Sequence, residues 1–385
     1  MTDLHSSHQT LLHLLRLALG SPAGEAVDLS ALNRTDWEEL VDLSFDQGVA
    51  ALAVDGLQRS LDVAPEPVEG SAESFGSTGS PTENAELALD SPELEDLKYE
   101  WFGEVFARED DYGQQLGAIR YLTGLWSAAG LDTFALKGVA FAQYYPVPEH
   151  RYSCDFDCNV RRADGSPAWA EADRIARKNG IEVDDSMNKH SRYVVREVSV
   201  ENHRSIISVN GSRKDKRFDA YLQGLLCASK RSLLPDVKLY SPCWLFNALF
   251  CVAHARTHFI QEDGITLKHV LDWVLIRRAP EAATYREQFE KDIDRFELRK
   301  FFDALDSVAD YVMGIGEGLT ESQRLMLDDI LSLKDVRHFD SRSLAHLNIL
   351  RTLWTNRWKF RLYSDTSFLA TVWRYVYGHF FDRDF

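Results

Sequence analysis

The strongest constraint on the fold is the stretch from Phe134 to Val160, "FALKGVAFAQYYPVPEHRYSCDFDCNV". Its last nine residues, 152–160, alternate between apolar or cysteine side chains and polar ones. Because successive side chains of a β-strand point to opposite faces, this period of two predicts a strand with one buried face. Asp155 and Asp157 then lie side by side on the other face, with Cβ atoms about 7 Å apart. That separation suits two carboxylates that share a divalent ion.

The spacing of these two aspartates is not enough to assign a function. The same Asp-x-Asp pattern occurs as "DID" at residues 292–294, within a helical pattern, and as "DRD" at residues 382–384, at the C-terminal end. Solvated acids at a strand edge are also common in proteins without a metal. The residues around each pair therefore have to decide between a metal site and an ordinary polar surface.

The segment upstream of the alternating stretch favours a phosphate site. A short strand over 133–136 is followed by Lys137 and Gly138 and then by a predicted helix over 139–145. A strand, a turn and a helix start in this order direct backbone N–H groups, the helix dipole and a lysine toward the same region. A lone Lys-Gly pair is as often an ordinary turn, but its combination with two acids in one short unit is much rarer.

Composition indicates a folded, multidomain protein. The chain has 385 residues, of which 45% are hydrophobic, which is enough for substantial cores. Its five cysteines have no paired spacing, as in proteins of a reducing compartment, and the first residues lack the basic region of a signal peptide. No apolar run is long enough to span a membrane, so we expect a cytoplasmic location. The net charge of −17 argues against a protein that coats nucleic acid.

Changes of composition along the chain predict four parts. Residues 1–60 show helical periodicity, and residues 61–90 form an acidic linker or loop rich in Pro, Gly and Ser. Residues 91–235 contain a long leading helix and the strands described above, and residues 236–385 are helical again. The aromatic and basic C-terminus either packs on the helical part or contacts a membrane surface peripherally.

Further residues of the middle part are candidates for the same site. Ser166 and Pro167 predict the start of a helix, and the runs over 191–200 and 202–209 predict a hairpin whose second arm begins near Glu201. Glu201 is therefore the best candidate for a third acid. Glu197 and Asp219 are weaker candidates.

Two histidines in the helical part share one helix face. His254 and His258 are four residues apart, and Cys251 precedes them by one turn. This spacing is compatible with a zinc site. However, the segment "HARTH" lacks the glutamate of the His-Glu-x-x-His motif, which leaves packing or substrate contact as the alternative.

These residues together resemble a known family. The stretch "ALKGVAFAQYYPVPEHRYSCDFDCNV" resembles the signature of the uncharacterised nucleotidyltransferase family within the polymerase-β-like nucleotidyltransferase superfamily. The resemblance covers about residues 91–380. The matching positions of the signature are Leu136, Lys137, Gly138, Tyr144, Tyr145, Pro146, Arg151, Asp155 and Asp157. The later segments "VENHRSI", "VAHARTHF" and "LKHVLDWVLI" are similar to further family elements, which place Glu201, His203, His254, His258, Lys268 and Asp272.

The resemblance implies an α+β fold, in which a small mixed β-sheet nucleotidyltransferase core with flanking helices precedes a mainly helical C-terminal domain. It implies that Asp155, Asp157 and Glu201 bind Mg²⁺ (or Mn²⁺) and are the catalytic acids. It further implies a set of nucleotide- and phosphate-binding residues. That set consists of Lys137, Gly138, Arg151, His203, His254, His258, Lys268 and Asp272.

The implied reaction moves a nucleoside monophosphate from an NTP to a hydroxyl-bearing acceptor and releases pyrophosphate. The acceptor is a small molecule, a protein side chain or an RNA end. The chain departs from the superfamily pattern because Lys137 and Gly138 stand where that pattern has Gly-Ser, which leaves phosphate contacts to backbone N–H groups and the lysine. The alternative is a catalytically weak or inactive member that binds a nucleotide or a partner.

Overall fold

The computed structural model describes residues 6–24, 29, 32–62, 92, 94–209, 212–316, 318–332 and 345–381. The chain divides into two compact units. The first contains Met1–Asp110, Thr266–Lys268 and Ser307–Leu333, and the second contains Asp111–Ile265, His269–Asp306 and Lys334–Phe385. From residue 63 onward, the predicted linker over 61–90 lies outside the described residues, as does the pair at residues 382–384. The predicted division into four parts stays a prediction.

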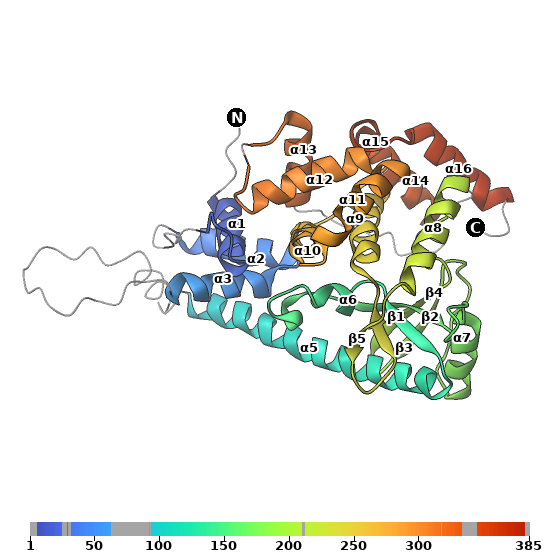
Figure 1. Ribbon diagram of the computed structural model, residues 1–385. Helices are drawn as coiled ribbons and strands as arrows, with labels where there is room; N and C mark the ends of the chain where they lie inside the picture. Colours follow the sequence, from blue (N-terminus) through green and yellow to red (C-terminus); the bar gives the residue numbers. More distant parts are fainter. Residues whose placement is uncertain are drawn as a thin grey trace, which may run out of the picture. The chain divides into compact units, whose positions relative to one another are not determined.

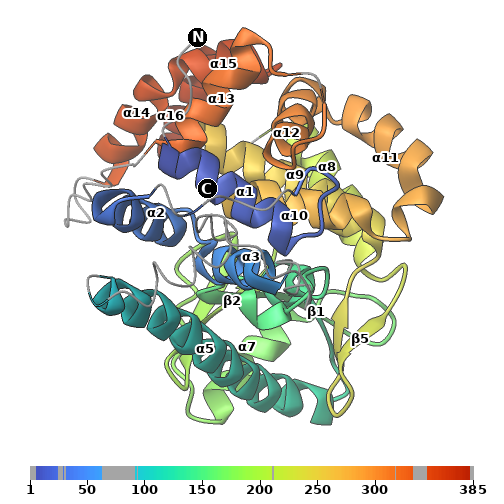
Figure 2. The same cartoon turned by 90° about the vertical axis from the view of Figure 1, so that its left-hand side faces the viewer.

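The first unit is helical. Its helices α1 (Ser6–Ala18), α2 (Arg34–Asp46) and α3 (Ala50–Asp62) lie together (Figure 2). Leu11, Leu14 and Leu15 of α1 are fully buried, and their three- and four-residue spacing places them on one face of the helix. The unit also contains α13 (Glu321–Leu331), the beginning of the long helix α5 (Glu95–Ala128) and the end of α12 (Arg299–Val312).

The second unit contains one mixed sheet. Its six strands run in the order β3-β4-β2-β1-β6-β5. Strand β2 pairs in parallel with β4 and antiparallel with β1, and β1 pairs in parallel with β6. The bounds are β1 (Asp132–Ala135), β2 (Asp155–Arg161), β3 (His190–Val195), β4 (Val198–His203), β5 (Arg231–Leu234) and β6 (Leu239–Ser241). This sheet is the core of the expected α+β fold.

Strand β2 differs from its prediction in two respects. It begins only at Asp155, so residues 152–154 precede it, and both of its faces are covered. Asp157 and Asn159, on the face that was expected to be open, are each only 2% exposed. The prediction of one buried face was therefore wrong. The alternation arises because the polar face packs against charged and hydrogen-bonding partners.

The hairpin of β3 and β4 turns earlier than predicted. Arg196 and Glu197 connect the two strands, and both have a positive φ, of 49° and 70°. Two consecutive residues with positive φ form the tight turn that matches the twist of a two-stranded ribbon. Glu201 consequently lies within β4, opposite Arg192, instead of at the start of the second arm.

The helix α7 (Trp169–Lys178) starts later than Ser166 and Pro167 predicted. The carbonyl of Ser166 accepts the N–H of Arg162, and Pro167 forms an isolated β-bridge with Arg161. These pairings keep the chain extended until Ala168. The prediction of a cap at Ser166 was wrong because strand-like pairing continues through it.

Helices cover the sheet and form the C-terminal region. Helix α9 (Trp244–Gln261) is buried along most of its length, and α8 (Arg213–Leu226) and α11 (Ala282–Arg295) pack against it (Figure 1). The other helices of this unit are α6 (Val139–Ala142), the 3-10 turn Pro148–His150, most of α10 (Leu267–Arg278), α14 (Ala345–Thr355), α15 (Arg357–Tyr363) and α16 (Phe368–Phe381). The sheet with flanking helices and a helical C-terminal region confirms the predicted fold class.

The aromatic C-terminus is partly packed. Leu353, Phe360 and Tyr363 are buried, whereas Trp354 and Trp373 are exposed. Among the residues that the structure describes, no helix is long and apolar enough to cross a membrane.

Candidate active site

The sheet brings the three predicted metal-binding acids together. Because β2 and β4 run in parallel with Asp157 opposite Glu201, these two side chains share one face of the sheet. Asp155 lies two residues before Asp157 and therefore shares that face as well. One carboxylate oxygen from each of the three acids lies within 4.8 Å of the others. This separation is suitable for carboxylates that share a divalent cation.

The weaker candidates for a third acid lie elsewhere. Asp219 of α8 accepts the backbone N–H groups of Ile206 and Ile207 at 2.6 and 3.2 Å, so it holds the chain after β4 in place. Glu197 occupies the turn of the hairpin. Of the three alternatives, only Glu201 joins the aspartates.

Gly138 allows the turn after β1 to pass close to β2. Its φ of 58° lies in the left-handed region, and a Cβ atom at this position would be 2.9 Å from Ser153 Oγ. A larger residue would therefore require movement of either segment. The predicted helix after this turn is only α6, a single turn of four residues, so a helix dipole contributes little here.

Lys137 points into the group of acids. Its Nζ atom lies 3.0 Å from Asp157 Oδ2 and 3.3 Å from Asp155 Oδ2. Burial would raise the pKa of Asp157, but Lys137 and His203 hold it well below its usual range. Burial and the neighbouring charge of Asp157 instead raise the pKa of Asp155. The pair thus combines one carboxylate that stays ionised with one that takes up a proton more readily.

His203 lies behind the acids. Its Nε2 atom is 2.9 Å from Asp157 Oδ1, and its Nδ1 atom is 3.2 Å from the carbonyl of Ser205. Because both partners only accept hydrogen bonds, the ring is held as an imidazolium. Burial opposes this charge, but the hydrogen bonds to Asp157 and Glu201 raise the pKa of His203 above its usual value. Both nitrogens of His203 are thus used to support the acids, and its predicted phosphate-binding role stays a prediction.

His190 and Arg192 of β3 hold Glu201, and the sequence did not single them out. His190 Nδ1 lies 3.3 Å from Glu201 Oε2, and Arg192 Nε lies 3.2 Å from Oε1. Burial lowers the pKa of His190 to about 4, so this ring is neutral at pH 7. Together with Glu201 and His203, His190 forms a second group of potential metal ligands. The available sequence signal was the i and i+2 spacing of His190 and Arg192, which places both side chains on one face of a strand.

Arg151 and Asp272 bind each other. The guanidinium Nε and Nη2 atoms each lie 2.8 Å from one oxygen of the Asp272 carboxylate, and both side chains are buried. The hydroxyl of Tyr145 donates to Asp272 Oδ1 at 2.9 Å. This geometry differs from the predicted phosphate contacts, because the carboxylate occupies the edge of the guanidinium that a phosphate would use. The pair fixes the segment before β2 to α10.

The two histidines of α9 lie in a small histidine group. The rings of His254 and His258 have centroids 4.3 Å apart, and the centroid of His269 lies 5.8 Å from that of His258. His258 Nδ1 is 2.7 Å from Glu262 Oε2. Burial, followed by the influence of the neighbouring His258 and Lys137, lowers the pKa of His254 far below its usual value. A neutral His254 therefore stands close to the lysine of the site.

The structure gives no support to a zinc site on this helix among the described residues. The groups of candidate metal ligands found among the described residues do not include His254, His258 or Cys251. Lys268 falls in the first unit, so its predicted role stays a prediction.

Lys189 is a further cation near the acids that no sequence motif singled out. Its positive charge contributes to lowering the pKa of His190 and Glu262 and opposes the raised pKa of His203, so it lies near the acids and near the end of α9. The residues that the structure describes provide it with no ion-pair partner, in contrast to Lys137. Lys189 directly precedes β3, and this position next to the start of a strand was its available sequence signal.

Comparison with known proteins gives one result for this chain. The model of a family described as "Uncharacterised nucleotidyltransferase" matches residues 33–314. The match includes Lys137, Gly138, the three converging acids and the histidines of α9. No curated protein and no solved structure matches the chain.

Proposed function

Because the chain belongs to the uncharacterised nucleotidyltransferase family, we propose that it transfers a nucleoside monophosphate from an NTP to the hydroxyl of an acceptor and releases pyrophosphate. The observation that carries this proposal is the convergence of the Asp155, Asp157 and Glu201 oxygens within 4.8 Å beside Lys137. Carboxylates at this spacing are what a divalent cation and a triphosphate require.

The donor atoms fit a hard divalent cation. Asp157 Oδ2 is buried, and its close partner is the Lys137 ammonium at 3.0 Å, so a metal cation would take the place that this lysine holds. Three carboxylates supply the oxygen ligands that Mg²⁺ and Mn²⁺ prefer. Asp155, Asp157 and Glu201 would hold the ion. When bound, it would neutralise phosphate charge and lower the pKa of the attacking hydroxyl.

The residues around the acids have separate roles in the proposed reaction. His203 and Arg192 hydrogen-bond to the carboxylates and so orient them, and the neutral ring of His190 lies beside Glu201. Lys137 neutralises the aspartates when no other cation is present, and its Nζ atom is placed to contact a phosphate when a cation takes over that function. Lys189 adds a second positive charge for the triphosphate.

The transfer step itself exchanges one bond at phosphorus. The acceptor oxygen bonds to the α-phosphorus, while the bond from that phosphorus to the bridging oxygen of the β-phosphate breaks. Pyrophosphate leaves with the electron pair, and the hydroxyl proton passes to water. Positioning and charge neutralisation supply most of the rate enhancement in such transfers.

The test uses the whole chain with each of the four α-³²P-labelled NTPs, with Mg²⁺ or Mn²⁺ and with a small-molecule extract as a pool of acceptors. We expect pyrophosphate release and label transfer with one or more NTPs, and loss of both in Asp155→Asn/Asp157→Asn. The matched control is Asp294→Asn, which removes the charge of an exposed acid from another Asp-x-Asp segment. The proposal fails if neither signal appears, or if the double variant equals the wild type.

A second candidate is a nucleotide-binding protein with weak or no catalysis. Lys137 favours it, because its ammonium already neutralises both aspartates without a metal. Mn²⁺ titration of the wild type distinguishes the two. If the protein binds NTP in the absence of a metal, and no label is transferred, the second candidate is correct.

A further inference from the structure

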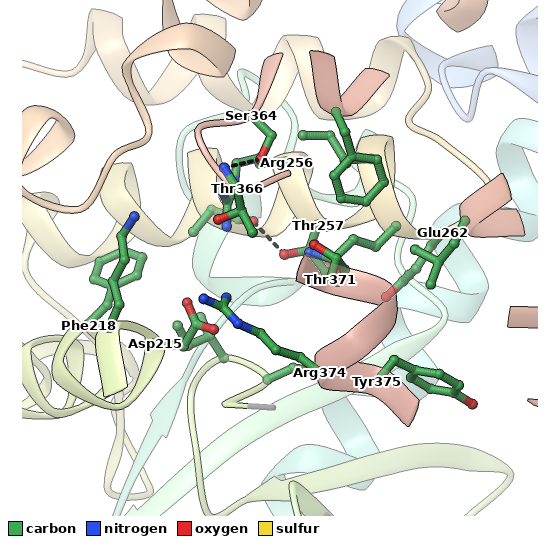
Figure 3. Close-up of a pocket in the computed structure, with 18 of the residues that line it drawn as sticks. Asp215, Phe218, Arg256, Thr257, Glu262, Ser364, Thr366, Thr371, Arg374 and Tyr375 are labelled. Carbon is green, nitrogen blue, oxygen red and sulfur yellow. Dashed lines mark hydrogen bonds between the residues drawn. The ribbon is translucent and has the colours of Figure 1, made fainter. Parts of the chain in front are cut away.

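A polar cavity lies beside the proposed active site. It has a volume of about 220 Å³ and lies between the start of α8, α9 and the helices α14 to α16 of the second unit (Figure 3). At ~30 Å³ per water, it holds about seven water molecules, which is the size of a small polar molecule or one end of a larger one. None of the residues that the family signature marks lies in its wall.

Two arginines of the cavity lack a protein partner. Arg256 comes from α9 and Arg374 from α16, and the described residues offer neither of them a hydrogen bond or an ion pair. The Nε atom of Arg256 is buried and unsatisfied. A desolvated guanidinium without a hydrogen-bonded anion is costly, so this arrangement calls for an anionic ligand.

The anions nearby do not fulfil this role. Burial lowers the pKa of Arg256, and the charges of Asp215 and Asp365 offset this only in part. The backbone N–H of Asp215 donates to the N-cap hydroxyl of Ser212, and burial raises the pKa of the Asp215 carboxyl although the charges of Arg256 and Arg374 oppose this rise. Lys214, the third cation of the wall, forms an ion pair with Glu297. Among the described residues of the wall, the two arginines are therefore the cations without a direct ion pair.

Hydroxyl groups and aromatic rings complete the wall. Thr257 donates its hydroxyl to the carbonyl of Ala253 and keeps its lone pairs for a donor in the cavity. Thr371 and Tyr375 come from α16, and Figure 3 shows them on the same side as Arg374. Such a wall suits a ligand that carries hydroxyl groups as well as an anion. The further aromatic residues of the wall are Phe218, Phe296 and Phe360.

One residue joins the cavity to the acids. Glu262 lines the cavity, and His258 holds its carboxylate at 2.7 Å. The charges of Lys137 and Lys189 contribute to lowering the pKa of Glu262, so both lysines of the active site lie near it. Ile207 and Ser208, which follow β4 and its Glu201, form another part of the wall. His203, which contacts Asp157 and Glu201, is followed four residues later by Ile207 of the wall, so this segment connects the cavity to the site of transfer.

We propose that this cavity binds the acceptor of the transfer reaction, and that the acceptor is a small hydroxyl-bearing anion, with its phosphate or carboxylate on Arg256 and Arg374. This assignment rests on the proposed nucleotidyltransferase function. A hydroxyl of the same molecule then faces the α-phosphorus held beside Asp155 and Asp157. The proposal excludes an uncharged sugar and a basic side chain as acceptors, because neither satisfies the two arginines.

The first experiment measures binding without NTP and with EDTA, so that it does not depend on catalysis. The full chain is titrated calorimetrically with glucose 6-phosphate, gluconate and glucose, which separate a phosphate, a carboxylate and an uncharged ligand of similar size. We expect one or both anions to bind and glucose not to bind. Arg256→Gln weakens anion binding by about tenfold or more, which corresponds to about 1.4 kcal/mol.

The controls separate a local effect from a loss of fold. Arg374→Gln changes an exposed side chain of the cavity and gives a comparable loss of anion binding. Arg286→Gln removes the same charge from the exposed surface of α11 and leaves binding unchanged. Circular dichroism melting verifies that all three variants are folded. Equal anion binding in wild type and in both cavity variants, binding of glucose as tight as that of the anions, or no binding of either anion overturns the proposal.

A second measurement adds labelled NTP and Mg²⁺ to the anion that binds. Label on that anion, lost in Arg256→Gln, supports its assignment as the acceptor class. Label transfer to other molecules of an extract, with no label on any anion, overturns the assignment but leaves the proposed function intact. Anion binding with no transfer from any NTP to any acceptor means instead that the proposed function fails.

Discussion

Two segments of this protein contain the same Asp-x-Asp spacing and use it in opposite ways. In β2, Asp155 and Asp157 point to one face and share Lys137. In α11, Asp292 is buried and accepts the hydroxyl of Tyr221 at 2.6 Å. Asp294 points to solvent and pairs there with an arginine of α12.

The difference follows from the backbone. Side chains two residues apart lie on the same face of a strand but about 200° apart around a helix, since each helical residue turns by about 100°. The helical pair therefore cannot form one site, however similar its sequence. The lesson is that a pair of acids indicates a metal site only after the period of its segment is known.

The largest expected effect is on catalysis. Asp155→Asn/Asp157→Asn should lower the rate of nucleotidyl transfer by at least about 10²–10³-fold, because the charges that position the triphosphate are lost. The corresponding change in the helix, Asp292→Asn/Asp294→Asn, should leave the rate of the folded protein unchanged. Label transfer from NTP, measured per folded molecule, provides the check. A similar loss of transfer rate in both double variants would contradict the distinction between the strand pair and the helical pair.

The next effect concerns metal binding. We expect Mn²⁺ to bind the wild type and to be removed by EDTA together with activity, and we expect the affinity for Mn²⁺ to fall about 10–100-fold or more in Asp157→Asn. Asp294→Asn should bind Mn²⁺ like the wild type, because its carboxylate has no second acid on the same face. Electron paramagnetic resonance of free Mn²⁺ measures the Mn²⁺ affinity of both variants and of the wild type. Unchanged Mn²⁺ affinity in Asp157→Asn would show that the metal binds elsewhere than at β2.

A smaller effect distinguishes the helical pair by stability. Asp292→Asn should lower the free energy of unfolding by about 1–3 kcal/mol, because the half-buried hydroxyl of Tyr221 loses a charged acceptor in the buried carboxylate. Asp294→Asn should change it by no more than about 1 kcal/mol, as its ion pair is exposed. Urea unfolding followed by fluorescence gives both values. A greater loss for Asp294→Asn would contradict the burial assigned to the two residues.

The smallest effect is a pH dependence at the strand site. The pKa of His203 is raised in the folded state, so its contribution to stability is complete below about 6.5 and is lost as the pH rises through the folded value. The lowered pKa of Asp157 places its own titration in acid, outside this window. The difference in unfolding free energy between wild type and His203→Gln should therefore shrink between pH 6 and pH 9. Unfolding in EDTA across this range measures it, and a constant difference would argue against an imidazolium.

Much of the fold and part of the site were accessible from sequence. The period of two around Asp155, the strand before Lys137 and the helical periodicity of the C-terminal part all predicted elements that the structure contains. The position of Glu201 beside the aspartates was also predicted. Its place within β4 was not, because the tight turn at residues 196–197 sets the register of the hairpin.

Contacts between distant segments were not accessible in this way. Arg151 and Asp272 are 121 residues apart, and only their convergence shows that they pair with each other. The i and i+2 spacing of His190 and Arg192 places them on one face of a strand, but only the antiparallel pairing of β3 with β4 shows that this face meets Glu201. The unpartnered Arg256 is likewise recognised only once the helices around it are in place.

By itself, the sequence determined the secondary structure around the acids, the family and the residue types of the site, because strand period, turn chemistry and motif order are local. The tertiary structure alone decided which charges neutralise one another. Lys137 and His203 are paired with the acids, Arg151 is bound to Asp272, and the Nε atom of Arg256 has no hydrogen-bond partner among the described residues. Electrostatic interactions depend on distance and burial in space, and neither is encoded in the order of neighbouring residues.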